Sequence, residues 1–298
     1  MVNIGIIGIG RWGKNLLRNF DSVANVDWVC HTGTTENREW LTDNYPEVSV
    51  TTDPAELLSQ REIDAVAIAT PIDTHATLAH QAIKAGLDTF VEKPLATDYE
   101  QTAALQRLAS EKGCRLLVGY IFVYHPLMQP IFELANEESL SQVRFSWEKF
   151  GAFCEDLLLD LVCHPVSILH QVFGTQPVIN QARFGPSFSD TETSFEGTLE
   201  YEGATVDISV SRFSPHDTKL MTVASSQGTV LCWTDTELYE FDQHVNMLRE
   251  IRTLSSEPLA EECRRFVHAV ENDAHIPSDG AFASEISHTL DRLRETLR

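Results

Sequence analysis

One residue in this chain that could take part in acid–base chemistry is a lysine at the end of a short apolar run. Lys93 lies in the segment Val91–Leu95. An ammonium group at the end of a strand can polarise a hydroxyl or carbonyl oxygen. The alternative interpretation is an exposed pair with the neighbouring Glu92, which contributes little to stability or function.

Asp160 and His164 form a second candidate pair. Asp160 has leucine on both sides, and a carboxylate in so apolar a run is costly unless it is paired or functional. At helical spacing the two residues share one face, where the imidazole can accept a proton and the carboxylate can orient it. Alternatively, Asp160 caps a helix and His164 is a core histidine. Pro165 favours this alternative, because inside a helix it removes the backbone hydrogen bond to Leu161.

Three glycines, Gly8, Gly10 and Gly13, follow the apolar run at the start of the chain, and the helical stretch Lys14–Phe20 comes next. In a strand–turn–helix context this spacing favours a dinucleotide site. The first glycine permits the tight turn, the second lets the backbone approach a pyrophosphate, and the third lets the helix pack close to the strand. The alternative is a plain strand–helix turn.

Two further loops carry polar or aromatic side chains that a site could use. One follows an apolar strand candidate, and turn chemistry alone explains its proline and threonines, of which Thr74 could cap the next helix. The other stands near residue 120 and either lines a substrate cleft or packs between domains. The residues are Thr70, Pro71 and His75 in the first loop and Tyr120, Tyr124 and His125 in the second.

The first 120 residues alternate apolar strand candidates with helical stretches. Continuous apolar strands separated by helices indicate a parallel sheet covered on both faces, with ligands at the carboxyl ends of the strands. The expected strands are Ile4–Gly8, Val26–Cys30, Ala65–Ala69, Thr89–Val91 and Leu116–Gly119, and the clearest helices between them are Thr74–Ala85 and Tyr99–Lys112.

The pattern changes after residue 120. A helix at Pro126–Glu137, a strand at Val143–Phe150 and a helix ending near Phe173 precede a region, Gln181–Phe241, that alternates apolar and polar residues as half-buried antiparallel strands do. Two helices, Leu259–Glu271 and Ala281–Leu297, close the chain.

We therefore expect two domains. Residues 1–120 form an α/β Rossmann domain with a doubly wound parallel sheet that binds a dinucleotide. Residues 121–298 form an α+β domain with an open, mainly antiparallel sheet for substrate binding and oligomerisation, and its last helices can pack back on the first domain. One face of an open sheet must be covered, so we expect a homodimer or homotetramer through it.

Composition limits the classes of partner. The chain has 298 residues and a formal net charge of -22, which disfavours binding to nucleic acid and to anionic membranes. No apolar run reaches the length of a membrane span, and no basic segment precedes the first apolar run as in a signal peptide. The six cysteines include no C-x-x-C pair, so we expect reduced thiols in a cytoplasmic protein and no metal.

Taken together, the chain resembles the glucose–fructose oxidoreductase, inositol dehydrogenase and rhizopine-catabolism (GFO/IDH/MocA) family nearly end to end. The resemblance implies a nicotinamide-dependent oxidoreductase that acts on a hydroxyl or keto carbon of a sugar or cyclitol. A narrower similarity, to nucleotide-sugar 3-dehydrogenases, lies around residues 118–126 and 160–168. The family resemblance depends on the glycine fingerprint, Thr70-Pro71…His75, Glu92-Lys93-Pro94, Asp160…His164, Gln227-Gly228-Thr229 and Ser278-Asp279-Gly280.

The resemblance also assigns roles to residues. Lys93 binds the reacting oxygen, His164 is the general acid/base, and Asp160 is a carboxylate that binds substrate. Departures from the family pattern at Val162, Pro165 and Ser167 bear on the substrate. The implied cofactor-binding residues are Gly8, Gly10, Arg11, Trp12, Gly13, Thr32, Arg38, Thr70, Pro71, His75, Glu92 and Lys93, and the substrate-binding residues are Tyr120, Tyr124, His125, Lys93, Asp160 and His164.

The end of the second strand bears on the choice of cofactor. Folds that prefer NAD place an acidic residue there for the ribose 2′-hydroxyl. This chain has no carboxylate before Glu36, and hydroxyls such as that of Thr32, with Arg38, could hold a 2′-phosphate. We therefore expect NADP(H) to bind at least as well as NAD(H).

Two other functions remain open at this stage. A protein of the same fold could sense a dinucleotide and regulate a partner without catalysis. An enzyme of this fold could also reduce a non-sugar carbonyl or an imine with NADPH. The presence of Lys93, Asp160 and His164 together favours catalysis over sensing.

Overall fold

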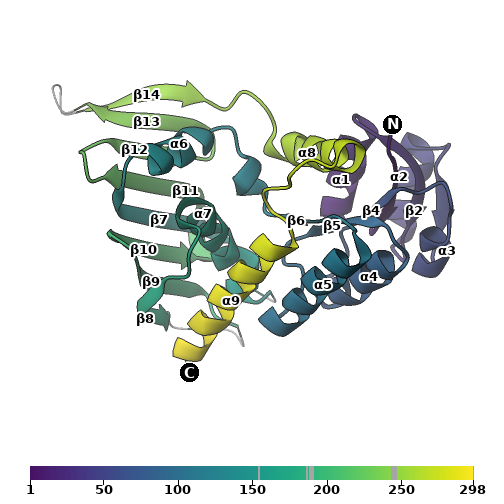
Figure 1. The fold of residues 1–298 in the computed structure, drawn as a ribbon, viewed down its shortest axis with the longest axis horizontal. Helices are drawn as coiled ribbons and strands as arrows, with labels where there is room; N and C mark the ends of the chain where they lie inside the picture. Colours follow the sequence, from purple (N-terminus) through teal and green to yellow (C-terminus); the bar gives the residue numbers. More distant parts are fainter. Residues whose placement is uncertain (154, 186, 188–190, 243–246, 298) are drawn as a thin grey trace. The chain divides into compact units, whose positions relative to one another are not determined.

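The computed structural model describes residues 1–153, 155–185, 187, 191–242 and 247–297. The chain divides into two compact units (Figure 1). Unit 1 comprises Met1–Ile121 and Pro258–Ser287, and unit 2 comprises Phe122–Glu257 and His288–Arg298. Helix α9 (Gly280–Thr296) begins in unit 1 and ends in unit 2.

Unit 1 contains a six-stranded parallel sheet with the strand order β3-β2-β1-β4-β5-β6. Strands β4 and β6 are buried at every position and β1 at all but its first residue, as the continuous apolar runs predict. The doubly wound Rossmann fold expected for this half is confirmed. The strands are β1 (Asn3–Ile7), β2 (Asn25–Cys30), β3 (Ser49–Thr51), β4 (Ala65–Ile68), β5 (Asp88–Glu92) and β6 (Leu116–Gly119).

Helices cover both faces of this sheet. Figure 1 draws α4 and α5 on one face and α1 and α8 on the other. The sequence analysis did not identify the short strand β3, and it gave no bounds for the helices α2 and α3 beside it, because these segments are polar or only a few residues long. The helices are α1 (Arg11–Asp21), α2 (Thr35–Asn44), α3 (Pro54–Leu58), α4 (Ile72–Lys84), α5 (Tyr99–Lys112) and α8 (Pro258–Asn272).

Helix α4 begins earlier than the sequence suggested. It starts at Ile72 with Pro71 as its N-cap, so Thr74 is not the capping residue. The Thr74 hydroxyl instead donates a hydrogen bond to the Pro71 carbonyl oxygen at 2.7 Å, inside the first turn. Proline fixes its own φ near the helical value, which makes it a favourable residue at the start of a helix.

The segment Pro258–Ser287 is built into unit 1 by packing and by hydrogen bonds. On α8, the Phe266 ring packs edge-on against Phe20 of α1 and Phe90 of β5, with ring centroids 6.0 and 5.8 Å apart. Further on, the Ser278 hydroxyl donates to the Val118 carbonyl oxygen at 2.7 Å. The end of the chain therefore completes the core of the first unit.

Unit 2 contains an eight-stranded sheet with the order β14-β13-β12-β11-β7-β10-β9-β8. The β7–β10 pair is parallel and the other pairs are antiparallel, so the mainly antiparallel sheet expected for this half is confirmed. The strands are β7 (Leu140–Phe150), β8 (Val178–Phe184), β9 (Ser194–Tyr201), β10 (Ala204–Ser211), β11 (Phe213–Ser225), β12 (Val230–Thr234), β13 (Glu237–Asp242) and β14 (Met247–Thr253).

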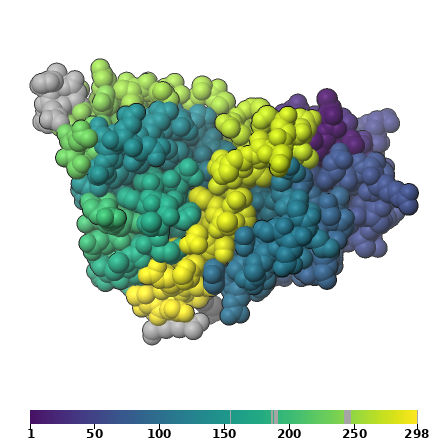
Figure 2. Space-filling model, viewed as in Figure 1, coloured from purple at the N-terminus to yellow at the C-terminus, as the bar shows by residue number. Residues whose placement is uncertain are grey.

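Helices α6 (Gln129–Glu137) and α7 (Cys163–Phe173) cover one face of the second sheet. In Figure 2 their teal and blue-green atoms hide much of the sheet from this side. Large apolar side chains nevertheless remain exposed in unit 2, including Phe150, Val178 and Phe213. None of the helices in the described part of the chain combines the length and the apolar composition that a bilayer crossing requires.

The aromatic packing of α8 leads to a stability prediction. Replacing the fully buried Phe266 with alanine should lower the free energy of unfolding by about 3–5 kcal/mol, because it leaves a cavity between α1, α8 and β5. Urea unfolding followed by circular dichroism measures the change. Val50→Ala, at a site of the same unit that is 47% exposed, is the control and should cost less than about 1 kcal/mol. Equal losses in the two variants would contradict this packing.

Candidate active site

The turn after β1 has the geometry of a dinucleotide cradle. Gly8 has φ +100°, and a Cβ there would lie 2.5 Å from the Ala69 carbonyl oxygen. A Cβ on Gly13 would lie 2.0 Å from the Gly8 carbonyl oxygen, so α1 approaches the turn as only glycine allows. By contrast, a Cβ on Gly10 would have no atom within 4 Å. Gly8 and Gly13 are therefore required by the packing of the turn, while Gly10 leaves open space there.

Helix α1 begins at Arg11 directly after this turn, with Gly10 as its N-cap and no side chain capping it. The first N–H groups of an α-helix have no partner within the helix, and the positive end of the helix dipole favours an anion. The residues at the turn therefore fit a bound pyrophosphate. Arg11 and Trp12 are both exposed at this position.

The loop after β4 is tied to the loop after β5 by His75. One ring nitrogen lies 2.8 Å from the Pro94 carbonyl oxygen and the other lies 2.8 Å from the Thr70 carbonyl oxygen. Burial lowers the pKa of His75, although these two carbonyl oxygens oppose the shift. The ring of His75 thus lies between the two loops. Thr70 is partly exposed and Pro71 is exposed.

Lys93 follows β5 and precedes a cis peptide bond to Pro94. Lys93 is partly exposed, at the carboxyl edge of the sheet where Rossmann folds bind ligands. The neighbouring Glu92 lies close to the backbone of β6, since a Cβ on Gly119 would be 3.1 Å from Glu92 Oε2. Burial raises the pKa of Glu92 to about 7, and the Lys93 ammonium opposes that rise.

The end of β2 presents a residue that the sequence analysis missed. His31 is buried directly after the strand, and its Nδ1 accepts a hydrogen bond from the Gly33 N–H at 3.1 Å. Burial and the nearby Arg38 guanidinium lower the pKa of His31. Thr32 and Arg38 are exposed. The position of His31, where an acidic residue stands in NAD-preferring folds, was the signal that could have identified it.

In unit 2, Asp160 is paired rather than capping a helix. Its carboxylate lies 3.2 Å from the Lys149 Nζ, and the two side chains are 18% and 33% exposed. The capping residue is Asp156, whose side chain accepts hydrogen bonds from the Leu158 and Leu159 N–H groups. This pairing explains how a carboxylate is tolerated within the apolar run.

Pro165 does not interrupt the helix that carries His164. A π-helical turn, Leu158–Val162, continues into α7, and Pro165 is the third residue of α7. The π-helical turn directly before Pro165 departs from regular α-helical hydrogen bonding, which accommodates a residue that lacks an N–H. Asp160 and His164 therefore lie on one continuous helical segment.

Aromatic rings surround the partly exposed His164. Its ring lies 5.1 Å from the Phe122 ring and 5.7 Å from the Trp147 ring, measured between centroids. Trp233 packs against both of these aromatic residues, at 5.8 and 6.3 Å. The sequence analysis missed all three rings, although Trp147 and Lys149 are two residues apart on β7 and so belong to one face of the strand.

The aromatic residues near position 120 lie in packed interiors. Tyr120 is fully buried in unit 1 and packs against Phe282 at 5.9 Å. Tyr124 is buried in unit 2, as is His125, whose ring nitrogens contact the Asp235 carbonyl oxygen and the Leu127 N–H. Burial lowers the pKa of His125. Direct substrate contact by these side chains stays a prediction.

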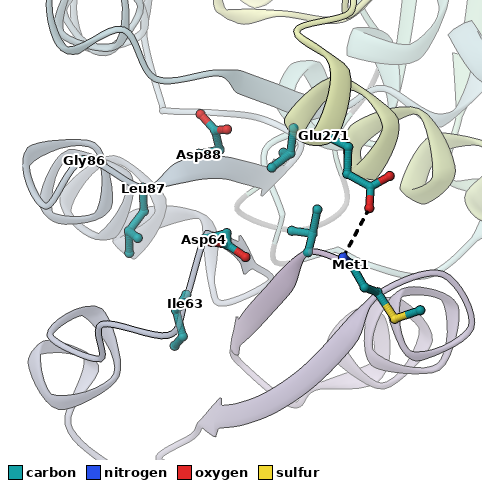
Figure 3. Close-up of a pocket in the computed structure, with 9 residues that line it drawn as sticks. Met1, Ile63, Asp64, Gly86, Leu87, Asp88 and Glu271 are labelled. Carbon is teal, nitrogen blue, oxygen red and sulfur yellow. Dashed lines mark ion pairs between the residues drawn. The ribbon is translucent and has the colours of Figure 1, made fainter.

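A hollow of about 500 Å³ lies at the opposite edge of the first sheet (Figure 3). Met1, Asp64 and Asp88 line it near the amino ends of β1, β4 and β5, and the N-terminal amine lies 3.8 Å from Glu271. Parallel sheets bind ligands at their carboxyl ends, so we do not assign the cofactor to this hollow. Among the residues that the structure describes, no group of three or more metal-ligating side chains was found.

Comparison with protein families supports the geometry. Residues 2–120 match a family described as an oxidoreductase family with an NAD-binding Rossmann fold. Residues 133–231 match the GFO/IDH/MocA C-terminal domain.

Relatives of this chain include sugar and cyclitol dehydrogenases. UDP-N-acetylglucosamine 3-dehydrogenase from Acidithiobacillus ferrooxidans is 28% identical over 58% of this chain and 55% of its own length. The scyllo-inositol 2-dehydrogenase (NAD(+)) of Bacillus subtilis is 24% identical over 91% of this chain and 86% of its own. The matches to the first of these relatives thus span little more than half of that relative's length.

Solved structures of other proteins share the fold of this chain. The structure of the UDP-N-acetylglucosamine 3-dehydrogenase from Acidithiobacillus ferrooxidans superimposes with a TM-score of 0.90, at 20% identity over 99% of this chain and 97% of that one. A similarity at this level of identity shows the shared fold.

The contrast between the glycines gives a test of the cradle. Gly10→Ala should leave the melting temperature nearly unchanged, because its Cβ meets no protein atom, but should weaken dinucleotide binding at least about tenfold by blocking the phosphate. Fluorescence titration with NADPH and NADH measures the affinity. Gly13→Ala, whose Cβ would overlap the Gly8 carbonyl oxygen, should instead destabilise the fold. Unchanged affinity in Gly10→Ala would place the cofactor elsewhere.

Proposed function

Because the chain belongs to the GFO/IDH/MocA family of oxidoreductases, we propose that it transfers a hydride between a nicotinamide cofactor and a hydroxyl or keto carbon of a sugar, cyclitol or nucleotide sugar. One observation carries this proposal. The glycine turn after β1, the Thr70 loop after β4 and Lys93 after β5 follow three neighbouring strands at the same edge of one sheet. This edge is where a Rossmann fold holds a dinucleotide.

In the proposed reaction, the bound nicotinamide supplies the site that accepts or donates the hydride. The chain's own residues handle the oxygen and the proton. In the oxidative direction, the Lys93 ammonium binds the reacting oxygen and stabilises its developing negative charge. The imidazole of His164 accepts the hydroxyl proton as the carbinol C–H bond breaks, and it returns that proton in the reverse direction.

Asp160 is proposed to bind a substrate hydroxyl. Its pairing with Lys149 orients the carboxylate, and the second carboxyl oxygen can accept a hydrogen bond from a sugar hydroxyl. The rings of Phe122 and Trp147 beside His164 add an apolar wall of the kind that packs against sugar C–H groups. Such a wall also limits access of water to the imidazole.

The names of relatives support the substrate class without fixing the sugar. They include a UDP-N-acetylglucosamine 3-dehydrogenase and a scyllo-inositol 2-dehydrogenase. We propose NADP(H) as the preferred cofactor, held at its 2′-phosphate by Thr32 and Arg38, since no carboxylate stands at the end of β2. One relative, the D-xylose 1-dehydrogenase (NADP(+)) 2 of Haloferax volcanii, is named for that cofactor.

We also propose a cytoplasmic homodimer or homotetramer that contacts neither nucleic acid nor membrane. The exposed apolar residues of unit 2, such as Phe150, Val178 and Phe213, favour coverage by a second copy of the chain. The net charge of -22 opposes binding to anionic polymers.

Removing either proton-handling group tests the mechanism. Lys93→Ala or His164→Ala should lower turnover by about two to four orders of magnitude, because each removes an acid/base or oxyanion-stabilising partner. Turnover is measured as the change in nicotinamide absorbance with a panel of free sugars, cyclitols, nucleotide sugars and small ketones. Lys84→Ala, at an exposed position of α4, is the control and should keep wild-type rates. Near-normal rates in a variant would remove that residue from the mechanism.

The cofactor proposal has its own test. Arg38→Ala should weaken NADPH binding about 10- to 100-fold and change NADH binding little, because a charge-assisted bond to the 2′-phosphate is lost. Fluorescence titration of both cofactors against wild type and variant measures this. A clear wild-type preference for NADH would contradict the proposal.

A further inference from the structure

A carboxylic acid is buried in unit 1 without any hydrogen-bond partner. Glu262 lies on the inward face of α8 and is only 1% exposed. Among the residues that the structure describes, neither of its carboxyl oxygens has a hydrogen-bond partner. The other buried residues of that face are Leu259, Cys263, Phe266, Val267 and Ala269.

Such a group is expensive to keep in its charged form. An ionised carboxylate without a partner loses its hydration on burial, so the neutral acid is favoured. Burial raises the pKa of Glu262 well above its ordinary value of 4.5, and the negative charge of Glu92 raises it further. Glu262 therefore carries a proton where an ordinary glutamate does not.

The second carboxyl of this pair is the Glu92 side chain. Glu92 ends β5 and shares a strand face with Phe90, while Glu262 shares a helix face with Phe266 on α8. The Phe90 and Phe266 rings pack together at 5.8 Å, so the two glutamates project from facing surfaces of β5 and α8. The next residue along the chain is Lys93, whose ammonium favours the ionised form of Glu92. Glu92 thus interacts with two groups, the neutral acid Glu262 and the ammonium group of Lys93.

We propose that Glu92 is a positioning residue whose charge decides how tightly the Lys93 amine keeps its own proton, while Glu262, on the facing side of α8, stays a neutral acid. This inference rests on the proposed function at one point, which is that the Lys93 ammonium binds the reacting oxygen. A tightly held proton keeps Lys93 cationic for the reacting oxygen. A neutral Glu92 loosens that proton.

The surroundings of the pair contain few competing charges. Glu92 is the charged group that acts on Glu262, and Lys93 is the one that acts on Glu92. From α1, the other helix against α8, the contact is the apolar ring of Phe20. The Lys93 ammonium also opposes protonation of His75, which sits on the far side of Pro94.

The charge state of Lys93 can be read directly by chemical labelling. Only a neutral amine reacts with acetic anhydride, so the labelling rate of Lys93, followed by mass spectrometry at several pH values, reports its proton affinity. In Glu92→Gln, Lys93 should label about tenfold faster than in wild type at about pH 8, where wild-type Glu92 is ionised. The two rates should converge at about pH 6, where wild-type Glu92 is protonated.

Glu262→Gln is the matched variant for the stored proton. Because Gln replaces a neutral acid by a neutral amide, Lys93 labelling should follow the wild-type curve. The exposed Lys84 and Lys112 are internal controls whose labelling should not change in any variant. Glu92→Met makes the same charge change and replaces Glu92→Gln if that variant does not fold.

Stability gives a second, independent reading of Glu262. An acid whose pKa is raised on folding binds its proton more tightly in the native state, so its contribution to stability is lost as pH rises from about 4.5 toward its native value. In that window the unfolding equilibrium constant of wild type should increase about tenfold more per pH unit than that of Glu262→Gln. Urea unfolding at pH 5 to 8 measures the difference.

Three results would overturn the inference. These are equal Lys93 labelling in wild type and Glu92→Gln, faster Lys93 labelling in Glu262→Gln at pH 8, and an unchanged pH dependence of stability in Glu262→Gln. None of these measurements requires a substrate or a cofactor. A chain that passes them but transfers no hydride would contradict the proposed function and leave the carboxyl pair intact.

Discussion

The account depends on one geometric constraint, which is that parallel strands end at a common edge. In the first sheet β1, β4 and β5 are neighbours in register, so the residues that follow them are brought together although they are far apart in sequence. Gly8, Thr70 and Lys93 occupy that edge. His75 lies between the two loops, with its ring nitrogens 2.8 Å from the carbonyl oxygens of Thr70 and Pro94. A small set of backbone and side-chain contacts thus places a cationic group beside a turn shaped for a dinucleotide.

Polar groups near the two candidate sites are stabilised in different ways. Asp160 is paired with the Lys149 ammonium at 3.2 Å, which compensates for the apolar residues around it. Glu262 has no such partner and is stabilised by holding a proton instead. The free-energy cost of burying a charge is offset by an ion pair in unit 2 and avoided by protonation in unit 1. The second solution couples the first unit to pH.

Much of the fold followed from the sequence, for physical reasons that individual segments illustrate. The strands at Ile4–Gly8 and Ala65–Ala69 are apolar at every position, which only burial on both faces explains. Segment Ser49–Thr51 is short and partly exposed, and its place in the sheet is set by pairing with β2 rather than by its own composition. Helix α2 is polar on most sides, so its sequence has no apolar periodicity that would predict a helix.

The positions of the candidate residues were predictable where they follow apolar strands and not where tertiary packing decides. Lys93 and the glycines follow strands at one edge of the first sheet, as the sequence predicted, and their roles in binding and catalysis stay predictions. The rings around His164 come from separate elements and meet only in the fold. Glu262 carried a sequence signal, since it stands four residues before Phe266 on the apolar stripe of its helix. Only the structure shows that, within the described part of the chain, its carboxyl oxygens have no hydrogen-bond partner.

The most direct measurement follows the hydride itself. The chain is incubated with oxidised cofactor and with sugar and cyclitol substrates that carry deuterium on the carbinol carbons, and the reduced cofactor is analysed by mass spectrometry. The account predicts that one deuterium appears in the nicotinamide ring and that the Lys93→Ala variant forms almost none. A cofactor that binds the wild-type chain but is never reduced, or that is reduced without deuterium, would contradict hydride transfer from a carbinol carbon.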